Sequence, residues 1–113
     1  MIIVTSESVA NVRVRRTFGL VRGTSVRGRH IGRDLIAHLR NAVGGEITEY
    51  TKMLSEAREQ ALDRMVEEAR AFGANAIVSV RFTTSTSMAG SAEIVVYGTA
   101  VRLELDDDDP QTA

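Results

Sequence analysis

Two histidines and an aspartate are, by type and spacing, the residues of this chain best suited to bind a metal ion. His30, Asp34 and His38 follow one another at intervals of four residues, so on one continuous helix they would share a face. Two imidazoles and a carboxylate can hold zinc. Gly28 and Gly32 favour a helix that begins after His30, which would separate His30 from the other two groups. Histidines near a helix start are therefore the simpler interpretation, and a metal site is the alternative.

Four arginines surround two pairs of spaced glycines and indicate a possible anion-binding segment. The arginines are Arg22, Arg27, Arg29 and Arg33, and the glycine pairs are Gly19-x-x-x-Gly23 and Gly28-x-x-x-Gly32. Neither spacing is a P-loop or a dinucleotide-binding fingerprint. The segment leads into a predicted helix start, where guanidinium and free backbone N–H groups can bind a small anionic ligand. Ion pairs with acids of a neighbouring copy, such as Glu46 or Glu93, are the simpler explanation.

The sequence contains no recognisable catalytic motif. Gly-x-Ser-x-Gly and His-Glu-x-x-His are both absent, as is cysteine, which excludes a cysteine nucleophile, a thiolate metal site and a disulfide. Carboxylates such as Asp63 and Glu68 fall on the polar side of a predicted long helix, and Arg64 precedes Glu68 by four residues, which is typical of a solvated, ion-paired face. We therefore expect no catalytic residue and no enzyme. An enzyme that acts on an anionic metabolite held by Arg22 and Arg27 is a third candidate.

Three segments alternate with the two-residue period of a β-strand. In residues 12–27 we expect the buried side to consist of Val12, Val14, Phe18, Leu20, Thr24 and Val26, with a bulge or turn near Gly19 or Gly23. Residues 76–85 place Ala76, Val78, Val80 and Phe82 on one face. Residues 92–103 are apolar on both faces, so both faces must be covered. The small polar residues 85–91 predict a hairpin loop between the last two strands.

Helical periodicity fills the segment between the first and second strands. Residues 33–43 predict a short helix that ends at Gly44, and residues 46–72 carry apolar side chains every three or four positions, as in one long amphipathic helix. Gly73 follows where a left-handed C-cap belongs. We therefore predict an α+β fold in two layers, in which the long helix packs on an antiparallel sheet.

One long helix can cover only one face of such a sheet. The last strand is apolar on both faces, and the chain has no second helix long enough to cover the other face. The most economical cover is another copy of the same chain, so the pattern predicts a homo-oligomer.

Composition and charge limit the classes of partner that the protein could bind and the cellular compartments in which it could occur. The chain has 113 residues and a formal net charge of −1. We expect it to form one domain over residues 1–105, followed by an acidic, disordered tail over residues 106–113. No apolar run can span a bilayer and no signal peptide is recognisable, so we expect a cytoplasmic protein without a membrane partner. Most aromatic residues fall on core stripes away from the arginines, so we expect no nucleic-acid partner.

Several short strings also resemble one known family. They are Gly44-Gly45-Glu46-Ile47, Gly73-Ala74-Asn75-Ala76, Val80-Arg81-Phe82 and Tyr97-Gly98-Thr99-Ala100-Val101. In this order and spacing, over about residues 2–104, the chain resembles the YbjQ-like family of uncharacterised bacterial and archaeal proteins, which is labelled "putative heavy-metal-binding domain". The resemblance implies a dodecin-like β-α-β-β subunit in a closed ring, typically a pentamer. It implies no established reaction, no cofactor beyond a possible metal ion and no defined set of ligands.

Overall fold

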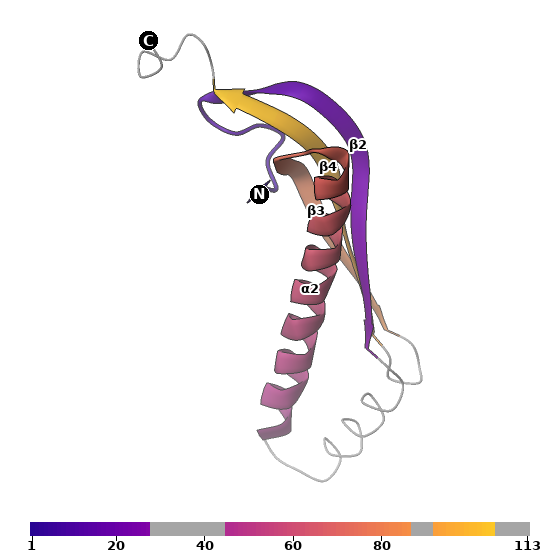
Figure 1. Cartoon of the computed structure of the whole chain (residues 1–113). Helices are drawn as coiled ribbons and strands as arrows, with labels where there is room; N and C mark the ends of the chain where they lie inside the picture. The colour runs from indigo at the N-terminus through magenta and orange to yellow at the C-terminus, as the bar shows by residue number, and fades with distance from the viewer. Residues whose placement is uncertain (28–44, 87–91, 106–113) are drawn as a thin grey trace.

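The computed structural model describes residues 1–27, 45–86 and 92–105, which form one helix packed on a four-stranded sheet (Figure 1). In chain order the elements are β1 (Ile2–Ile3), β2 (Val12–Arg27), α2 (Gly45–Phe72), β3 (Ala76–Thr86) and β4 (Ala92–Leu105). The α+β class and the packing of a long helix on a sheet are confirmed. The predicted helix over residues 33–43, most of the predicted hairpin loop and the acidic tail lie outside the described residues.

The strand order in the sheet is β1-β3-β4-β2, and β4 pairs antiparallel with both β2 and β3. β1 pairs parallel with β3, so the sheet is mixed and the expectation of a purely antiparallel sheet is wrong at this edge. The N–H of Ile2 donates to the carbonyl of Asn75 at 3.1 Å, and the N–H of Val4 donates to that of Ile77 at 3.0 Å. A two-residue strand is too short to show a two-residue period, which is why the sequence pattern did not predict it.

Helix α2 forms as the sequence predicts and lies close to the sheet. Ala57, Ala61, Met65 and Ala69 are fully buried along its inner side. A Cβ atom built on Gly23 of β2 would lie 1.9 Å from the carbonyl oxygen of Ala61, so only glycine permits this approach. The alanine stripe and Gly23 therefore fix the separation of helix and sheet.

The helix ends at the predicted glycine. Gly73 has a φ of 87°, its N–H donates to the carbonyl of Arg70 at 2.9 Å, and the N–H of Ala74 donates to that of Ala69 at 3.1 Å. This pair of bonds is the Schellman motif, which satisfies carbonyls at the helix end. The left-handed C-cap predicted from the sequence is confirmed.

The buried side of β2 differs from the prediction. Val21 and Ser25 are fully buried beneath α2, whereas Leu20 and Val26, which we expected to be buried, are 64% and 59% exposed. The pairing of β2 with β4 shifts twice, between Val14 and Arg16 and between Thr17 and Gly19, and Gly19 has a φ of 117°. Each bulge inserts a residue and reverses the alternation, so the two together restore it. By the register, Val12, Val14, Leu20 and Val26 share one face as predicted, but it is the face opposite α2. The predicted bulge near Gly19 is confirmed. The face that α2 covers carries Val21, Gly23 and Ser25, a less apolar set than Leu20, Thr24 and Val26, so the apolar pattern indicated the opposite face.

A further irregularity interrupts the alternation of β3. The register with β4 shifts between Val78 and Arg81, and Ser79 has a φ of 55°. As a result Ile77 and Val80 both pack beneath α2, although the sequence places them on opposite faces. The N–H groups of Ser79 and Val80 donate to the carbonyls of Ser6 and Val4 at 2.9 and 3.1 Å. The N-terminal segment thus binds the irregular part of β3.

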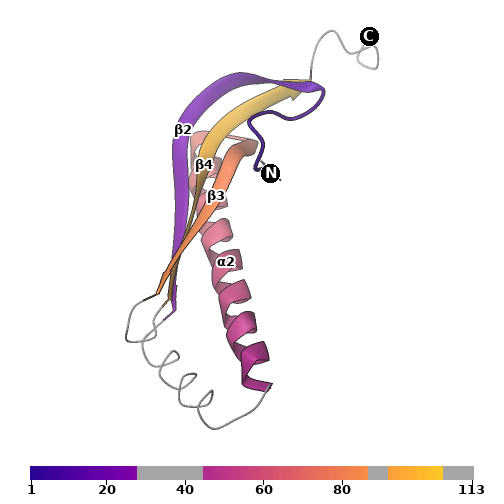
Figure 2. The same ribbon diagram turned by 180° about the vertical axis from the view of Figure 1, so that it is seen from behind.

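β4 has a buried residue set on each face, as its sequence predicts. Ile94, Val96 and Ala100 pack beneath α2, whereas Val101 and Leu103 belong to a second apolar cluster on the opposite face. Val4, Val9 and Val12 pack against this second cluster. The inference that only another copy could cover the second face is therefore wrong for the upper part of the sheet, because the N-terminal segment covers it (Figure 2).

Candidate functional site

The lower part of the sheet face opposite α2, which we call the outer face, carries polar and apolar side chains from three strands. The register of the strands defines this face, because residues directly opposite each other in an antiparallel pair share a face. It consists of Leu20, Arg22, Thr24 and Val26 from β2, Glu93, Val95, Tyr97 and Thr99 from β4, and Arg81, Thr83 and Ser85 from β3. No described helix lies over it (Figure 2).

One register row of the outer face brings two arginines to either side of a tyrosine. Tyr97 of the central strand pairs with Arg22 of β2 and with Arg81 of β3. All three residues are exposed, Tyr97 by 37%. Side chains directly opposite each other on neighbouring strands have Cβ atoms about 5 Å apart, so both guanidinium groups can reach the vicinity of the tyrosine ring. We call these three residues the Arg–Tyr–Arg row.

The guanidinium of Arg81 is held in place by the backbone. Its Nη1 donates to the carbonyl of Thr5 and to the carbonyl of Val80, each at 2.8 Å. An arginine has five N–H donors, of which Nη1 carries two, so the donors on Nε and Nη2 are left for another partner. This side chain is therefore a fixed positive group, anchored to the N-terminal segment, on the strand next to Tyr97.

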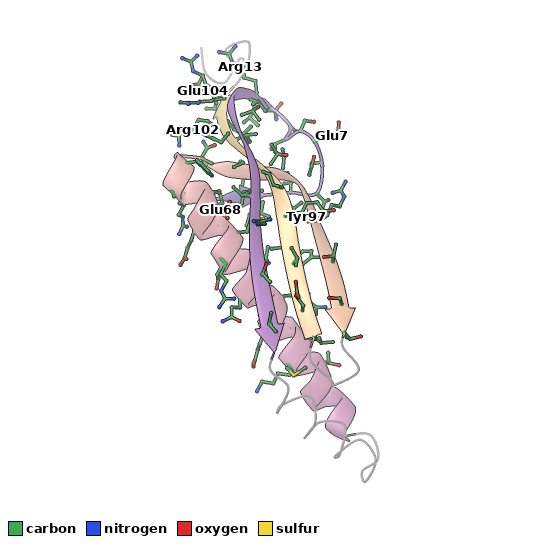
Figure 3. All side chains as sticks on the ribbon, turned by 90° about the vertical axis from the view of Figure 1, so that its right-hand side faces the viewer. Glu7, Arg13, Glu68, Tyr97, Arg102 and Glu104 are labelled. Atoms are coloured by element: carbon green, nitrogen blue, oxygen red, sulfur yellow. The ribbon has the colours of Figure 1, made fainter. Side chains whose placement is uncertain are left out.

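The positive charges of the row have no acidic partner among residues 1–27, 45–86 and 92–105. The ion pairs described in this part of the chain involve Glu104, whose carboxylate lies 3.3 Å from Nε of Arg15 and 4.0 Å from Nη2 of Arg13. These residues lie at the far end of β2 and β4, where Arg13 and Glu104 are labelled in Figure 3. Within these residues, the row is thus a basic site without an acidic partner.

A second basic and aromatic cluster closes the C-terminal end of α2. The rings of Phe18 and Phe72 stack at 6.2 Å with an interplanar angle of 21°, and the guanidinium of Arg16 lies 5.1 Å above Phe18. Nη1 of Arg102 donates to the carbonyl of Gly73 at 3.3 Å. Cations near a helix C-terminus stabilise the helix, so capping of α2 is sufficient to explain this cluster.

Only part of the predicted anion site falls within the described residues. Arg22 lies on the outer face, and Arg27, the last residue of β2, pairs in register with Ala92. Arg29 and Arg33 lie outside the described residues. The described structure therefore brings Arg22 together with Arg81 and Tyr97.

The predicted metal ligands His30, Asp34 and His38 all lie outside the described residues. Within the described part of the chain, no three histidine, cysteine, aspartate or glutamate side chains gather closely enough to hold a metal ion. The residues described here thus do not fit a metal centre.

Sequence reasoning missed Arg81 and Tyr97 as site residues. It assigned most aromatic residues to core stripes, whereas Tyr97 lies exposed between two arginines. The available signal was the alternation in β3 and β4, but the bulge after Val78 decides which residue of β3 meets Tyr97. Tyr97 is thus an exception to the expectation that most aromatic residues lie away from the arginines.

No helix among the described residues is long and apolar enough to cross a membrane.

The chain is similar over nearly its whole length to proteins of one family. The model of the YbjQ_1 family, described as "Putative heavy-metal-binding", matches residues 1–104. A UPF0145 protein of Methanosarcina acetivorans is 52% identical over 103 residues, which are 91% of this chain and 97% of the relative. A UPF0145 protein of Thermus thermophilus is 55% identical over 104 residues, which are 92% of this chain and 91% of the relative. These names state no activity.

One solved structure has a similar fold. It is the crystal structure of a protein of unknown function that belongs to the DUF74 family, from Pediococcus pentosaceus. The alignment covers 92% of this chain and 98% of that chain with a TM-score of 0.63 and 15% sequence identity. At this identity the likeness shows the fold alone.

Proposed function

We propose, since this chain belongs to the YbjQ_1 family, that it is one subunit of a homo-oligomeric ring that binds a small ligand and catalyses no reaction. The match over residues 1–104 confirms the resemblance seen in the sequence. The dodecin-like ring of identical copies, with five as its expected number, is part of this proposal. The ligand site would lie where copies meet, around residues 19–33 and the outer face.

The observation that carries this proposal is the apolar and unpaired character of the outer face and its edge. Leu20 and Val26 are 64% and 59% exposed on a strand whose other side is buried beneath α2. β2 is the last strand of the sheet, so no described strand pairs with the second edge of its 16 residues. Long exposed edge strands with apolar side chains readily pair with another chain.

The two open edges of the sheet also suit a head-to-tail contact. β2 forms one edge, and residues 81–86 of β3 extend beyond the two-residue pairing with β1 at the other edge. A contact between two different surfaces of identical copies generates a ring when the rotation closes. In a closed ring neither edge is left unpaired.

Native mass spectrometry of untagged protein, combined with light scattering at micromolar concentration, tests this proposal. The expected species is a closed oligomer with the mass of five subunits. Leu20→Lys, which puts a charge on the outer face, should shift the mass toward smaller species. Ala71→Lys is the matched control, because Ala71 is exposed on α2, and it should leave the mass unchanged. A stable, folded wild-type monomer would contradict the proposal.

Metal binding is the second candidate function, and the description of the family favours it. The ligands would be His30, Asp34 and His38, as the sequence analysis proposes. Protein purified without an affinity tag should then contain stoichiometric zinc or copper, and the double variant His30→Ala, His38→Ala should lose it. Equal metal content in wild type and variant would exclude these ligands.

A further inference from the structure

We propose that the Arg–Tyr–Arg row, formed by Arg22, Tyr97 and Arg81, binds the phosphate group of a small phosphorylated ligand. The inference rests on the proposed function, because a row on a flat sheet becomes an enclosed site when a second copy covers the outer face. It assigns a role to Tyr97 and Arg81, and it gives the anionic ligand a chemical class.

The row places hydrogen-bond donors on both sides of a central hydroxyl group. Neighbouring strands lie about 4.8 Å apart, so the backbones of β2 and β3 are roughly 10 Å apart across β4. Arg22 and Arg81 thus stand at either side of Tyr97, in direct register with it. A tetrahedral oxyanion above the ring could accept hydrogen bonds from both guanidinium groups and from the phenol hydroxyl.

The backbone contacts of Arg81 prepare this site before a ligand binds. Nη1 is occupied by the carbonyls of Thr5 and Val80. The irregular register after Val78 brings Arg81 opposite Tyr97, and the N-terminal segment then anchors its guanidinium. A side chain that is already held in place loses less conformational entropy on binding.

The charge of the row distinguishes a phosphate from a carboxylate. Two guanidinium groups carry a charge of +2, and no acid within the described ranges forms an ion pair with either. Glu93, the acid of β4 on the same face, is four residues from Tyr97, which is about 13 Å along a strand. A phosphate monoester carries roughly −1.5 to −2 at neutral pH, whereas one carboxylate carries only −1. The phosphate therefore balances the row more completely.

The test is a titration of the assembled protein with inorganic phosphate and, separately, with phenyl phosphate, followed by calorimetry and melting temperature. Sodium chloride at equal ionic strength corrects for general screening. Arg22→Gln and Tyr97→Phe remove a donor group each, and both should weaken phosphate binding, Arg22→Gln by roughly tenfold. Arg58→Gln is the matched control: it removes the same charge from the exposed side of α2, where Arg58 contacts Ser55, and should bind phosphate like the wild type.

Arg81→Gln also loses the contacts to Thr5 and Val80, so Arg81→Lys is measured beside it. Lysine keeps the charge but not the planar group of donors, and its affinity should fall between wild type and Arg81→Gln. Tighter binding of phenyl phosphate than of inorganic phosphate would identify a phosphorylated organic ligand, and equal binding would identify recognition of the anion alone.

The mass of every sample is measured as well, so that failure of this inference and failure of the proposed function are separable. Oligomers that bind phosphate no better than chloride, or an Arg22→Gln oligomer with wild-type affinity, would overturn the inference and leave the assembly intact. A monomeric wild type would contradict the proposed assembly, and the same phosphate titration would still decide whether the row binds the anion.

Discussion

The two faces of β4 show how one strand can have two different roles. On the side of α2, Ile94, Val96 and Ala100 are all but inaccessible to solvent. On the outer face, Val95 and Thr99 are half-buried and Tyr97 is exposed. Strand propensity is shared by both faces, so the difference comes from what packs against each one. Among the described residues, the first face of β4 is covered by α2, whereas the lower part of the second face has no cover.

The upper part of the second face supports this reading. There Val101 and Leu103 are buried, because Val9 and Val12 pack against them. The N-terminal segment ends its cover before the rows that contain Tyr97 and Val95. Among the described residues the lower outer face has no such cover, and this is where the proposed contact with a second copy would lie.

The largest effect should come from the closest contact on the helix side. Gly23→Ala would place a Cβ atom 1.9 Å from the carbonyl oxygen of Ala61, so α2 would have to move away from the sheet. We expect the free energy of unfolding to fall by more than about 3 kcal/mol, the upper end of overpacking costs. Urea denaturation measures this change.

The matched control for this substitution is Gly73→Ala. A Cβ atom on Gly73 would meet nothing within 4 Å, but its φ of 87° is left-handed. The expected cost is only the conformational strain, roughly 1–2 kcal/mol. Equal costs at the two glycines would mean that the helix can adjust freely and that the contact at Gly23 is unimportant.

The next effect compares one apolar side chain from each face. Met65 is fully buried on the inner side of α2, against the sheet, and Met65→Ala should destabilise the subunit by about 3 kcal/mol. Leu20→Ala removes a side chain that is 64% exposed, so it should change subunit stability by about 0.5 kcal/mol or less. It should instead weaken assembly. Denaturation at several protein concentrations separates these contributions, because only the assembly term depends on concentration.

The smallest effect should come from the exposed ion pairs between the start of β2 and the end of β4. Glu104→Gln removes the pairs with Arg13 and Arg15, all of whose side chains are exposed. We expect a loss below about 1 kcal/mol that disappears in high salt. Thermal denaturation in low and high salt measures it. A larger loss of stability that persists in high salt would show that this end of β2 and β4 contributes substantially to the stability of the fold and is not simply a solvated surface.

The comparison of faces also explains which features could be predicted from the sequence. The long helix, its glycine cap and the hairpin pairing of the last two strands depend on local patterns, and all three are confirmed. The buried face of β2 was wrong, because α2 covers Val21, Gly23 and Ser25, which are less apolar as a set than Leu20, Thr24 and Val26 on the opposite face. In β3 the single bulge after Val78 moves Val80 to the face of Ile77, and the composition of a strand does not indicate where such a bulge lies.

The candidate site depended on the same missing information. Arg22 was recognisable as a residue suited to anions, but its neighbours across the sheet follow from the register. Tyr97 and Arg81 are 75 and 59 residues further along the chain, and the irregularity at Ser79 determines how Arg81 pairs. Local periodicity contains no information on that pairing.

The most direct test of whether a second copy covers the outer face is the reactivity of a thiol placed on it. The natural chain has no cysteine, so Leu20→Cys and the control Ala71→Cys each carry a single thiol, on the outer face and on exposed α2 respectively. At micromolar protein concentration, the thiol at position 20 should react several-fold more slowly with a small reagent than the thiol at position 71, and dilution should remove the difference. Equal rates at every concentration would contradict the account, because the outer face would then be open to solvent in the native protein.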